Sequence, residues 1–167
     1  MIDIRNELPT DVTAIDAVTR AAFASAEHSS GTEHAIVRAL RDAGRLEVSL
    51  VAEADGQAVG HVAASPVTIT GGATGWYGLG PVSVAPGHQG KSIGTALVTR
   101  ALSKLRAAGA AGCVVLGDPA YYARFGFRAE PRLVLPGVPA EYFQAIPFDG
   151  ECPVGEVAYH AAFEASA

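Results

Sequence analysis

One stretch in the middle of the chain constrains the fold more than any other. Residues 79–102 read LGPVSVAPGHQGKSIGTALVTRAL: an apolar strand that contains Gly80 and Pro81, then a glycine-containing loop, then a helix. Glycine and proline inside a strand weaken regular pairing, so we expect this strand, which also carries Gly78, to separate from a neighbour. The loop before the helix predicts backbone N–H groups that face an anion.

Loops of this kind occur in two kinds of anion site. Ala85 to Ser92 fits a relaxed phosphate-loop pattern, a small residue followed by Gly90-Lys91-Ser92, which indicates a nucleotide triphosphatase. Gln89 to Gly94 also fits a loop that holds the pyrophosphate of coenzyme A at the start of a helix. The loop alone leaves both interpretations open, and the rest of the chain has to separate them.

The surrounding pattern predicts an α+β fold. Apolar residues at helical spacing are clearest in the stripe formed by Ile93, Leu97, Ala101, Leu102 and Leu105. The expected strands are 2–7, 47–56, 58–70, 76–86, 112–118 and 155–163, and the expected helices are 9–24, 32–44, 92–109 and 119–127. Residues 25–31 read as a polar loop and 71–75 as a flexible connection. Hairpin strands thus precede a strand–helix–strand–helix–strand series, which predicts a sheet with helices on both faces.

Size and charge limit the class of protein. A chain of 167 residues is expected to form one domain, residues 1–167, and a hydrophobic content of 49% with 17% charged residues is typical of a globular protein. The net charge of −5 argues against nucleic acid or acidic membranes as partners. An anionic ligand would therefore need a local device such as a helix N-terminus.

Location and metal content are also expectations from the sequence. The opening MIDIRNELPTD lacks the basic and apolar regions of a signal peptide, and no apolar run approaches the ~20 residues of a membrane span, so we expect a cytoplasmic protein. Two cysteines, Cys113 and Cys152, fit a reducing compartment. The five histidines lack paired metal-ligand spacing, so we expect no metal site.

The order of the elements argues against the phosphate-loop interpretation. Phosphate-loop domains place the loop after their first strand and follow it with several parallel strand–helix units. Here hairpins precede the loop, few strands follow it, and Ala85-Pro86 replaces the first glycine of the pattern. A nucleotide-binding protein is therefore only a remote alternative.

Residues 79–102 closely resemble the acetyl-CoA motif of the GNAT superfamily of N-acetyltransferases. That motif is an apolar strand, Val-x-Pro, and Gln/Arg-x-x-Gly-x-Gly/Ala opening a long helix; here these are residues 81–84, 84–86 and 89–94. Ser92 departs from the pattern because it replaces the first loop glycine. We expect tolerance, since a serine hydroxyl at a helix start can itself donate a hydrogen bond to an anion.

A second segment supports the same resemblance. LGDPAYYARFGF, residues 116–127, is similar to the superfamily's second motif, in which a tyrosine lies four residues before a Gly-Phe pair, as Tyr122 does here. The opening strand and helix, the aromatic run and the tail resemble a group of small bacterial predicted N-acetyltransferases. This resemblance implies a mixed, mostly antiparallel sheet with a splayed central strand and helices on both faces.

The resemblance also implies a reaction. Acetyl-CoA is the implied co-substrate, and its acetyl group passes to an amine by direct attack in a ternary complex. The backbone N–H of Val84 is the implied oxyanion donor, and Tyr122 the implied general acid for the leaving thiolate. The implied acetyl-CoA contacts are Val82, Ser83, Val84, Gln89, Gly90, Lys91, Ser92, Ile93 and Gly94. Tyr121 is expected to pack in the core, and Arg124 to lie at the surface.

The general base and the acceptor are open at this point. Five residues lie on elements that could face the acceptor: Glu33, His34, Glu53, His61 and Tyr77. None has a spacing that singles it out, and a water chain is an alternative. The apolar, proline-rich segment 131–153 favours a small amine or a peptide N-terminus over a polyanion. The acyl-chain length is open, a homodimer through the tail is an expectation, and a non-catalytic CoA-binding or interaction module is the rival function.

Overall fold

The computed structural model describes residues 1–24 and 29–165. Residues 25–28, the first part of the expected polar loop, lie outside the described residues. The main sheet has the order β1-β2-β3-β4-β5-β7. Its strands are β1 (Ile2–Asn6), β2 (Val48–Ala54), β3 (Gln57–Ile69), β4 (Trp76–Val84), β5 (Gly112–Leu116) and β7 (Phe143–Pro147).

Neighbouring strands along this path are antiparallel, except for the parallel pair β4 and β5. The far half of β3 leaves the main sheet and pairs with β8 (Gly155–Tyr159), which in turn runs parallel to the short β6 (Leu133–Val134). The mixed, mostly antiparallel sheet predicted from the sequence is therefore confirmed.

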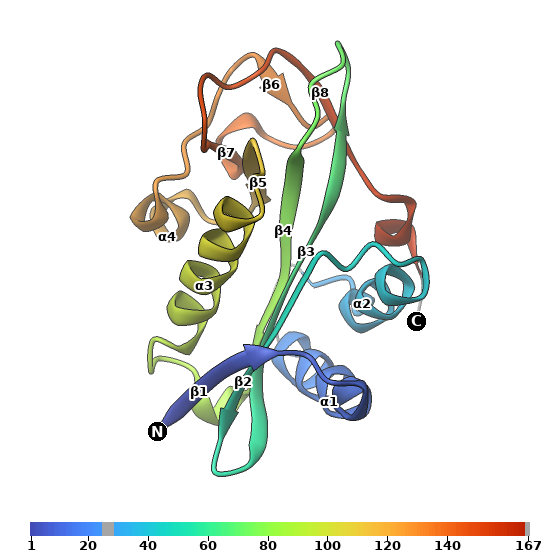
Figure 1. Ribbon diagram of the computed structural model, residues 1–167, viewed down its shortest axis with the longest axis vertical. Coiled ribbons are helices and arrows are strands. Elements are labelled where there is room, and N and C mark those ends of the chain that lie inside the picture. The colour runs from blue at the N-terminus through green and yellow to red at the C-terminus, as the bar shows by residue number, and fades with distance from the viewer. Residues whose placement is uncertain (25–28, 166–167) are drawn as a thin grey trace.

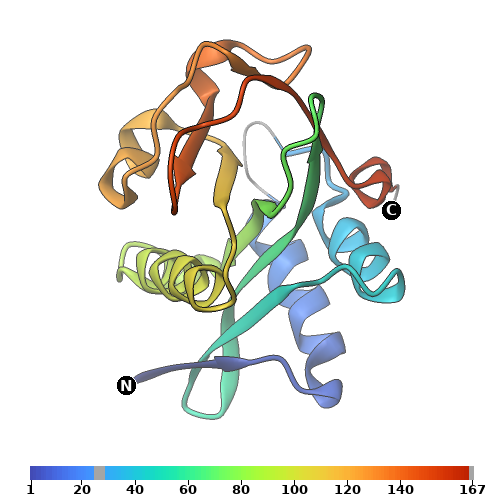
Figure 2. The same cartoon turned by 45° about the horizontal axis from the view of Figure 1, so that its top comes forward.

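Helices cover both faces of the sheet, as Figures 1 and 2 show. Helices α1 (Val12–Phe23) and α2 (Glu33–Asp42) pack on one face, and α3 (Ile93–Ala107) packs on the other. The short helix α4 (Pro119–Tyr122) follows β5, and Asp118 caps it by accepting a hydrogen bond from the Ala120 N–H at 3.0 Å. No helix within the described ranges is long and apolar enough to cross a membrane.

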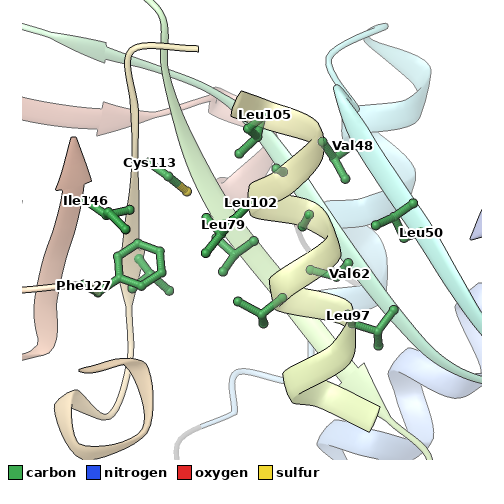
Figure 3. Packing of buried hydrophobic residues seen from close by; sticks show 14 of the residues in the cluster. Val48, Leu50, Val62, Leu79, Leu97, Leu102, Leu105, Cys113, Phe127 and Ile146 are labelled. Carbon is green, nitrogen blue, oxygen red and sulfur yellow. The ribbon is translucent and has the colours of Figure 1, made fainter. Parts of the chain in front are cut away.

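Alternation along the strands divides the core between the two faces. Val48 and Leu50 of β2 face α3, whose predicted apolar stripe is buried against them (Figure 3). Val51, the residue after Leu50, points to the opposite face and packs with Ile15 of α1 and Val37 of α2. The layers therefore follow from the period-2 pattern of the strands and the 3.6-residue pattern of the helices.

Strand β4 pairs on both edges only in its first half. Trp76 to Leu79 pair with β5, whereas Val82 to Val84 pair only with β3. The register between β3 and β4 shifts opposite Gly80-Pro81, where the strand bulges. The expected separation of this strand from its neighbour is confirmed, and it leaves one edge of β4 open beside α3 and α4.

Three expectations about the elements were wrong in detail. The proline-rich segment 131–153 contains β7, a strand that the sequence pattern did not predict. The last strand ends at Tyr159 and is followed by a 3₁₀ turn, Ala161–Glu164, because the His160 Nδ1 accepts from the Ala162 N–H. Pro9–Asp11 form a 3₁₀ turn rather than the start of α1.

Candidate functional site

The open edge of β4 presents unpaired peptide groups. The Ala85 N–H donates to the Val59 carbonyl at 2.8 Å, and Val84 lies opposite Gly60 in the register. Because hydrogen-bonded and non-hydrogen-bonded pairs alternate in an antiparallel ladder, Ser83 bonds across to β3 while Val82 and Val84 direct their peptide groups away from it. Those groups face the side where β5 has separated. The Gln89 side-chain amide donates to the Val84 carbonyl at 3.1 Å on this side.

A cavity of about 380 Å³ lies where this edge meets the start of α3. The first bond within α3 runs from the Ala96 N–H to the Ser92 carbonyl at 3.1 Å, so the N–H groups of residues 93–95 lie free at the helix start. The cavity lining joins Val84 to six of the loop residues and the next turn: His88, Gln89, Gly90, Ser92, Ile93 and Gly94. Lys91 is exposed and does not line it.

Two loop positions have a left-handed backbone. Gly90 has φ +78°, and Ser92, the N-cap residue of α3, has φ +64° and ψ +17°. This conformation costs an L-residue about 1–2 kcal/mol but suits glycine, which explains why the motif has glycine at position 92. The loop keeps its anion-binding shape with serine there. The Ser92 hydroxyl makes no capping bond to the helix.

Tyr121 and Arg124 form the opposite wall of this loop cavity. The Tyr121 hydroxyl lies 3.2 Å from Thr95 Oγ1, so Tyr121 is more than the core packing residue expected. Arg124 stacks on the Tyr121 ring at 4.3 Å from its centroid, and its Nε donates to the Tyr121 carbonyl at 2.9 Å. Its remaining guanidinium N–H groups stay available to an anion in the cavity.

A second cavity, of about 350 Å³, lies further along the same edge of β4. Gly80, Pro81 and Val82 line it from β4, and Tyr122 lines it from α4. The two cavities are therefore neighbours: one touches Val84 and Tyr121, the other Val82 and Tyr122. Ser83 belongs to neither lining, because its side chain is buried on the α1 face of the sheet.

Tyr122 is held as a neutral phenol. Burial raises its pKa to about 12, with smaller contributions from Tyr121 and Cys113. Its ring packs edge-on against Tyr121 at 5.0 Å and against Phe127 at 5.9 Å. Gly117 lets the ring lie close to the end of β5, because an added Cβ there would come within 2.5 Å of Tyr122 Cε2. The hydroxyl is thus protonated at neutral pH and able to donate.

The five candidate bases separate in the structure. Glu33 lines the second cavity. Glu53 instead pairs with Arg5 at 2.8 Å, Tyr77 lines a different hollow at the β3–β4 turn, and His34 is buried in α2. His61 is fully buried. The structure therefore brings Glu33, and none of the other four, to the cavity that contains Tyr122.

His61 is the buried end of a polar chain whose other members are partly exposed. The Glu7 carboxylate accepts from Arg41 at 2.8 Å and from the Ser49 hydroxyl at 2.6 Å, and Ser49 Oγ lies 2.8 Å from His61 Nε2. Because the Ser49 proton goes to Glu7, the Ser49 oxygen accepts from His61 Nε2–H. His61 Nδ1 is then an acceptor without a hydrogen-bond partner among the described residues. Burial lowers the His61 pKa to about 4.

Sequence reasoning missed three further aromatic residues that line the second cavity, Phe23, Tyr159 and Phe163. Tyr159 of β8 lines the second cavity and stacks on Phe163, with ring centroids 4.8 Å apart. Its ring lies over Gly78 of β4, where an added Cβ would come within 2.3 Å of it. Gly78, a glycine inside an apolar strand, indicated that something packs closely there. Its partner, Tyr159, lies 81 positions along the chain, and no local sequence pattern identifies it.

Comparison with known proteins agrees with this geometry. A model of the acetyltransferase (GNAT) family matches residues 14–127. The uncharacterized N-acetyltransferase YhbS of Escherichia coli K12 is 42% identical over 125 residues, which are 74% of this chain and 72% of that protein. The uncharacterized N-acetyltransferase YjhQ of the same strain is 35% identical over 103 residues, 60% of this chain and 56% of that protein.

Two solved structures are similar over nearly the whole chain. A GNAT family acetyltransferase from Brucella melitensis, crystallised with acetyl-CoA, is 52% identical with a TM-score of 0.88, and the match covers 98% of each chain. Escherichia coli YhbS, crystallised with CoA, is 36% identical with a TM-score of 0.87, covering 98% of this chain and 92% of that one.

Proposed function

The chain is an N-acetyltransferase that belongs to the GNAT family, and from that premise we propose that it moves the acetyl group of acetyl-CoA to a small-molecule amine. The reaction is a direct attack within a ternary complex, carried out by a single domain. The observation that carries the proposal is the open edge of β4, which connects an anion cavity at the start of α3 with a second cavity that contains Tyr122. The complexes of the Brucella and Escherichia relatives support it.

The loop cavity fits the pyrophosphate of acetyl-CoA. The free N–H groups of Ile93, Gly94 and Thr95 and the positive end of a 15-residue helix favour an anion there. Arg124 and His88 line the same cavity and add donors in a protein of net charge −5. Gly94 leaves the necessary space, because an added Cβ would lie 3.3 Å from the Tyr121 hydroxyl and 3.6 Å from Val84.

The open edge of β4 fits the pantetheine arm. Its amides can bond the peptide groups of Val82 and the N–H of Val84 as an added strand would, while the Val84 carbonyl already accepts from Gln89. This pairing directs the arm from the loop cavity toward the second cavity. The remaining predicted contacts in the loop cavity are Gln89, Gly90, Ser92 and Ile93. Ser83, whose peptide groups bond to β3, and Lys91 line neither cavity.

The second cavity supplies the groups that the reaction needs. The predicted oxyanion donor, the Val84 N–H, lies at the loop end of the open edge, and the Val82 N–H, two residues earlier on the same edge, lies at the second cavity. One of these two N–H groups donates to the carbonyl oxygen as negative charge develops on it. Tyr122 donates its proton to the leaving thiolate, and its raised pKa keeps that proton in place until then. The remaining contribution is positioning of the amine nitrogen against the thioester carbon.

Thermal unfolding with two ligands tests the proposal. At a concentration of 100 times Kd, acetyl-CoA stabilises the folded state by about 2.7 kcal/mol, which raises Tm by about 5–10 °C, and Mg-ATP leaves Tm unchanged. A shift with Mg-ATP alone would favour the phosphate-loop alternative. A shift with neither ligand, or binding of acetyl-CoA without turnover of any amine, would favour a non-catalytic module.

Tyr122→Phe tests the role of Tyr122 as the general acid. Loss of one general acid lowers kcat by about 100-fold, while the acetyl-CoA stabilisation is retained. Tyr142→Phe is the matched control, because Tyr142 is 46% exposed and lines neither cavity. Equal kcat values for the two variants would contradict the role of Tyr122.

A further inference from the structure

The cavity beside Tyr122 limits the chemistry of the acceptor. Apart from the backbone of β4, its lining is apolar and aromatic, with Phe23, Ile36, Leu79, Leu116 and Phe163 among the walls. Leu116 is one of these walls and is 46% exposed. An acceptor with an apolar body would cover it.

Few of the described side chains that line this cavity are polar, and one of them is charged. They are the hydroxyls of Tyr122 and Tyr159 and the carboxylate of Glu33. Burial raises the pKa of both tyrosines, so both are neutral. No lysine, arginine or histidine occurs among the described residues that line the cavity.

From this lining we infer that the acceptor is a primary monoamine on an apolar body, and that Glu33 receives the proton that its nitrogen loses. The inference rests on the proposed function, because it concerns the second substrate of the same site. Among the described residues of this lining, an amine that also carries a carboxylate or phosphate would find no cationic partner for that charge, and a second ammonium would find no second carboxylate.

Glu33 is fixed in place at the first position of α2. Its Oε1 accepts from the Ser29 hydroxyl at 2.9 Å, and its Oε2 accepts from the Ser30 N–H at 3.3 Å. The Ser30 hydroxyl also donates to Oε2, at 3.5 Å. Oε1 therefore keeps an acceptor position for an N–H of the substrate, so the carboxylate can first attract an ammonium and then take its proton.

The proton and electron pairs balance along this route. Two N–H bonds of the ammonium break in all. The first proton passes to a Glu33 oxygen, and the freed nitrogen lone pair forms the bond to the thioester carbon. The second proton leaves the nitrogen for water once that C–N bond has formed. The C–S bond breaks and the thiolate takes the Tyr122 proton. Glu33 releases its proton to water, and Tyr122 recovers one from water, so that ammonium and acetyl-CoA give amide, CoA thiol and one proton.

A panel of size-matched amines tests the substrate class. 2-Phenylethylamine is compared with phenylalanine, which adds a carboxylate, and n-pentylamine with 1,5-diaminopentane, which adds a second ammonium; CoA thiol release and product mass are the readouts. We expect kcat/KM to favour the apolar monoamine by about 100-fold in the first pair and about 10-fold in the second. A preference for either charged probe, or acetylation of peptides alone, would overturn the inference.

Glu33→Gln tests the role of the carboxylate. At pH 7 we expect its kcat/KM for 2-phenylethylamine to fall by about 100-fold, and the deficit to shrink to within about 10-fold at pH 10, where much of the amine arrives neutral. Glu156→Gln, an exposed glutamate of β8 outside both cavities, is the matched control. A deficit of equal size at both pH values would indicate a merely structural residue and would overturn the assignment.

The same experiments separate this inference from the proposed function. If acetyl-CoA fails to raise Tm for the wild-type protein, the proposed function itself fails. If acetyl-CoA raises Tm and amines are turned over, but without the monoamine preference and the pH-dependent loss in Glu33→Gln, only the inference fails.

Discussion

Ser92 is the residue at which this chain departs from the motif it otherwise follows. Its backbone is left-handed, φ +64°, and replacing serine by glycine would remove the cost of a Cβ in that conformation, which stabilises the folded state. Glycine would also give the unfolded chain more conformational freedom, which destabilises the folded state. The first effect is the larger, so Ser92→Gly should stabilise the protein by about 0.5–1 kcal/mol. Denaturant unfolding measures this difference.

The same helix offers a control of opposite sign. Ser103 is exposed in the middle of α3, where Ser103→Gly should destabilise the protein by about 0.5–1 kcal/mol through the helix propensity of glycine. Destabilisation by both substitutions would mean that the Ser92 hydroxyl makes a contact that outweighs its backbone strain. Because loop geometry is unchanged, the acetyl-CoA stabilisation should persist in Ser92→Gly.

The sequence located candidate site residues only where they belong to a local motif. Tyr122 and the loop residues could be located because their spacing to Gly126 and to α3 is local. The roles of Tyr121 and Glu33 could not, because each depends on which side of a cavity a separate element occupies. Among the five candidate bases, Glu33 is distinguished by lining the second cavity together with residues of β4.

At the scale of elements, the glycines and the proline of β4 serve two different purposes that look alike in the sequence. Gly80 and Pro81 mark the bulge where β4 leaves β5, as the sequence predicted. Gly78 instead provides room for the Tyr159 ring. Strand β7 escaped prediction because its five residues lie in a proline-rich segment and include the buried Gln144, whose side chain bonds the Gly117 carbonyl at 3.1 Å.

Gly78→Ala tests how β8 is held against β4. The new Cβ would lie 2.3 Å from Tyr159 Cε1 and 3.1 Å from Val67 Cγ1, so the Tyr159 ring must move out of its stack on Phe163. We expect a loss of about 2 kcal/mol in the free energy of unfolding, because overpacking of this kind costs about 1–3 kcal/mol. Denaturant unfolding measures the loss.

Two further variants show whether the clash with Tyr159 is the cause. Gly87→Ala, at a position with no atom within 4 Å of the added Cβ, should change stability by less than about 0.5 kcal/mol. In a Tyr159→Leu background, Gly78→Ala should cost clearly less than in the wild type. An equal cost in both backgrounds would place the strain elsewhere in β4.

At the scale of the whole molecule, a partly buried polar chain links the β1 side to the middle of the sheet. Arg41, Glu7, Ser49 and His61 link α2, the segment after β1, β2 and β3 by hydrogen bonds. Burial alone would raise the Glu7 pKa, but the hydrogen bonds from Arg41 and Ser49 outweigh it and lower that pKa. The sequence listed His61 as a possible base, since a single buried histidine looks the same in sequence as a catalytic one.

The neutral His61 makes the stability of the whole fold depend on pH. Its pKa is about 4 in the folded protein and 6.5 in its ordinary state, so between these values the unfolded chain binds a proton that the folded chain does not. Stability therefore falls as the pH falls through this window, by about 3 kcal/mol between pH 7 and pH 4. Glu7 and Asp11, whose pKa values are lowered, lose their contribution at lower pH.

His61→Gln isolates the contribution of His61 to the pH dependence of stability, because glutamine keeps an N–H for Ser49 and does not titrate. Urea unfolding between pH 7 and pH 4.5 should show a wild-type loss about 2–3 kcal/mol larger than that of the variant. If the variant does not fold, NMR titration of the wild-type imidazole gives the same answer through a midpoint near pH 4. A midpoint near 6.5 would mean that water reaches the His61 ring, and that burial at the inner end of the chain from Arg41 does not make the stability of the fold depend on pH in this window.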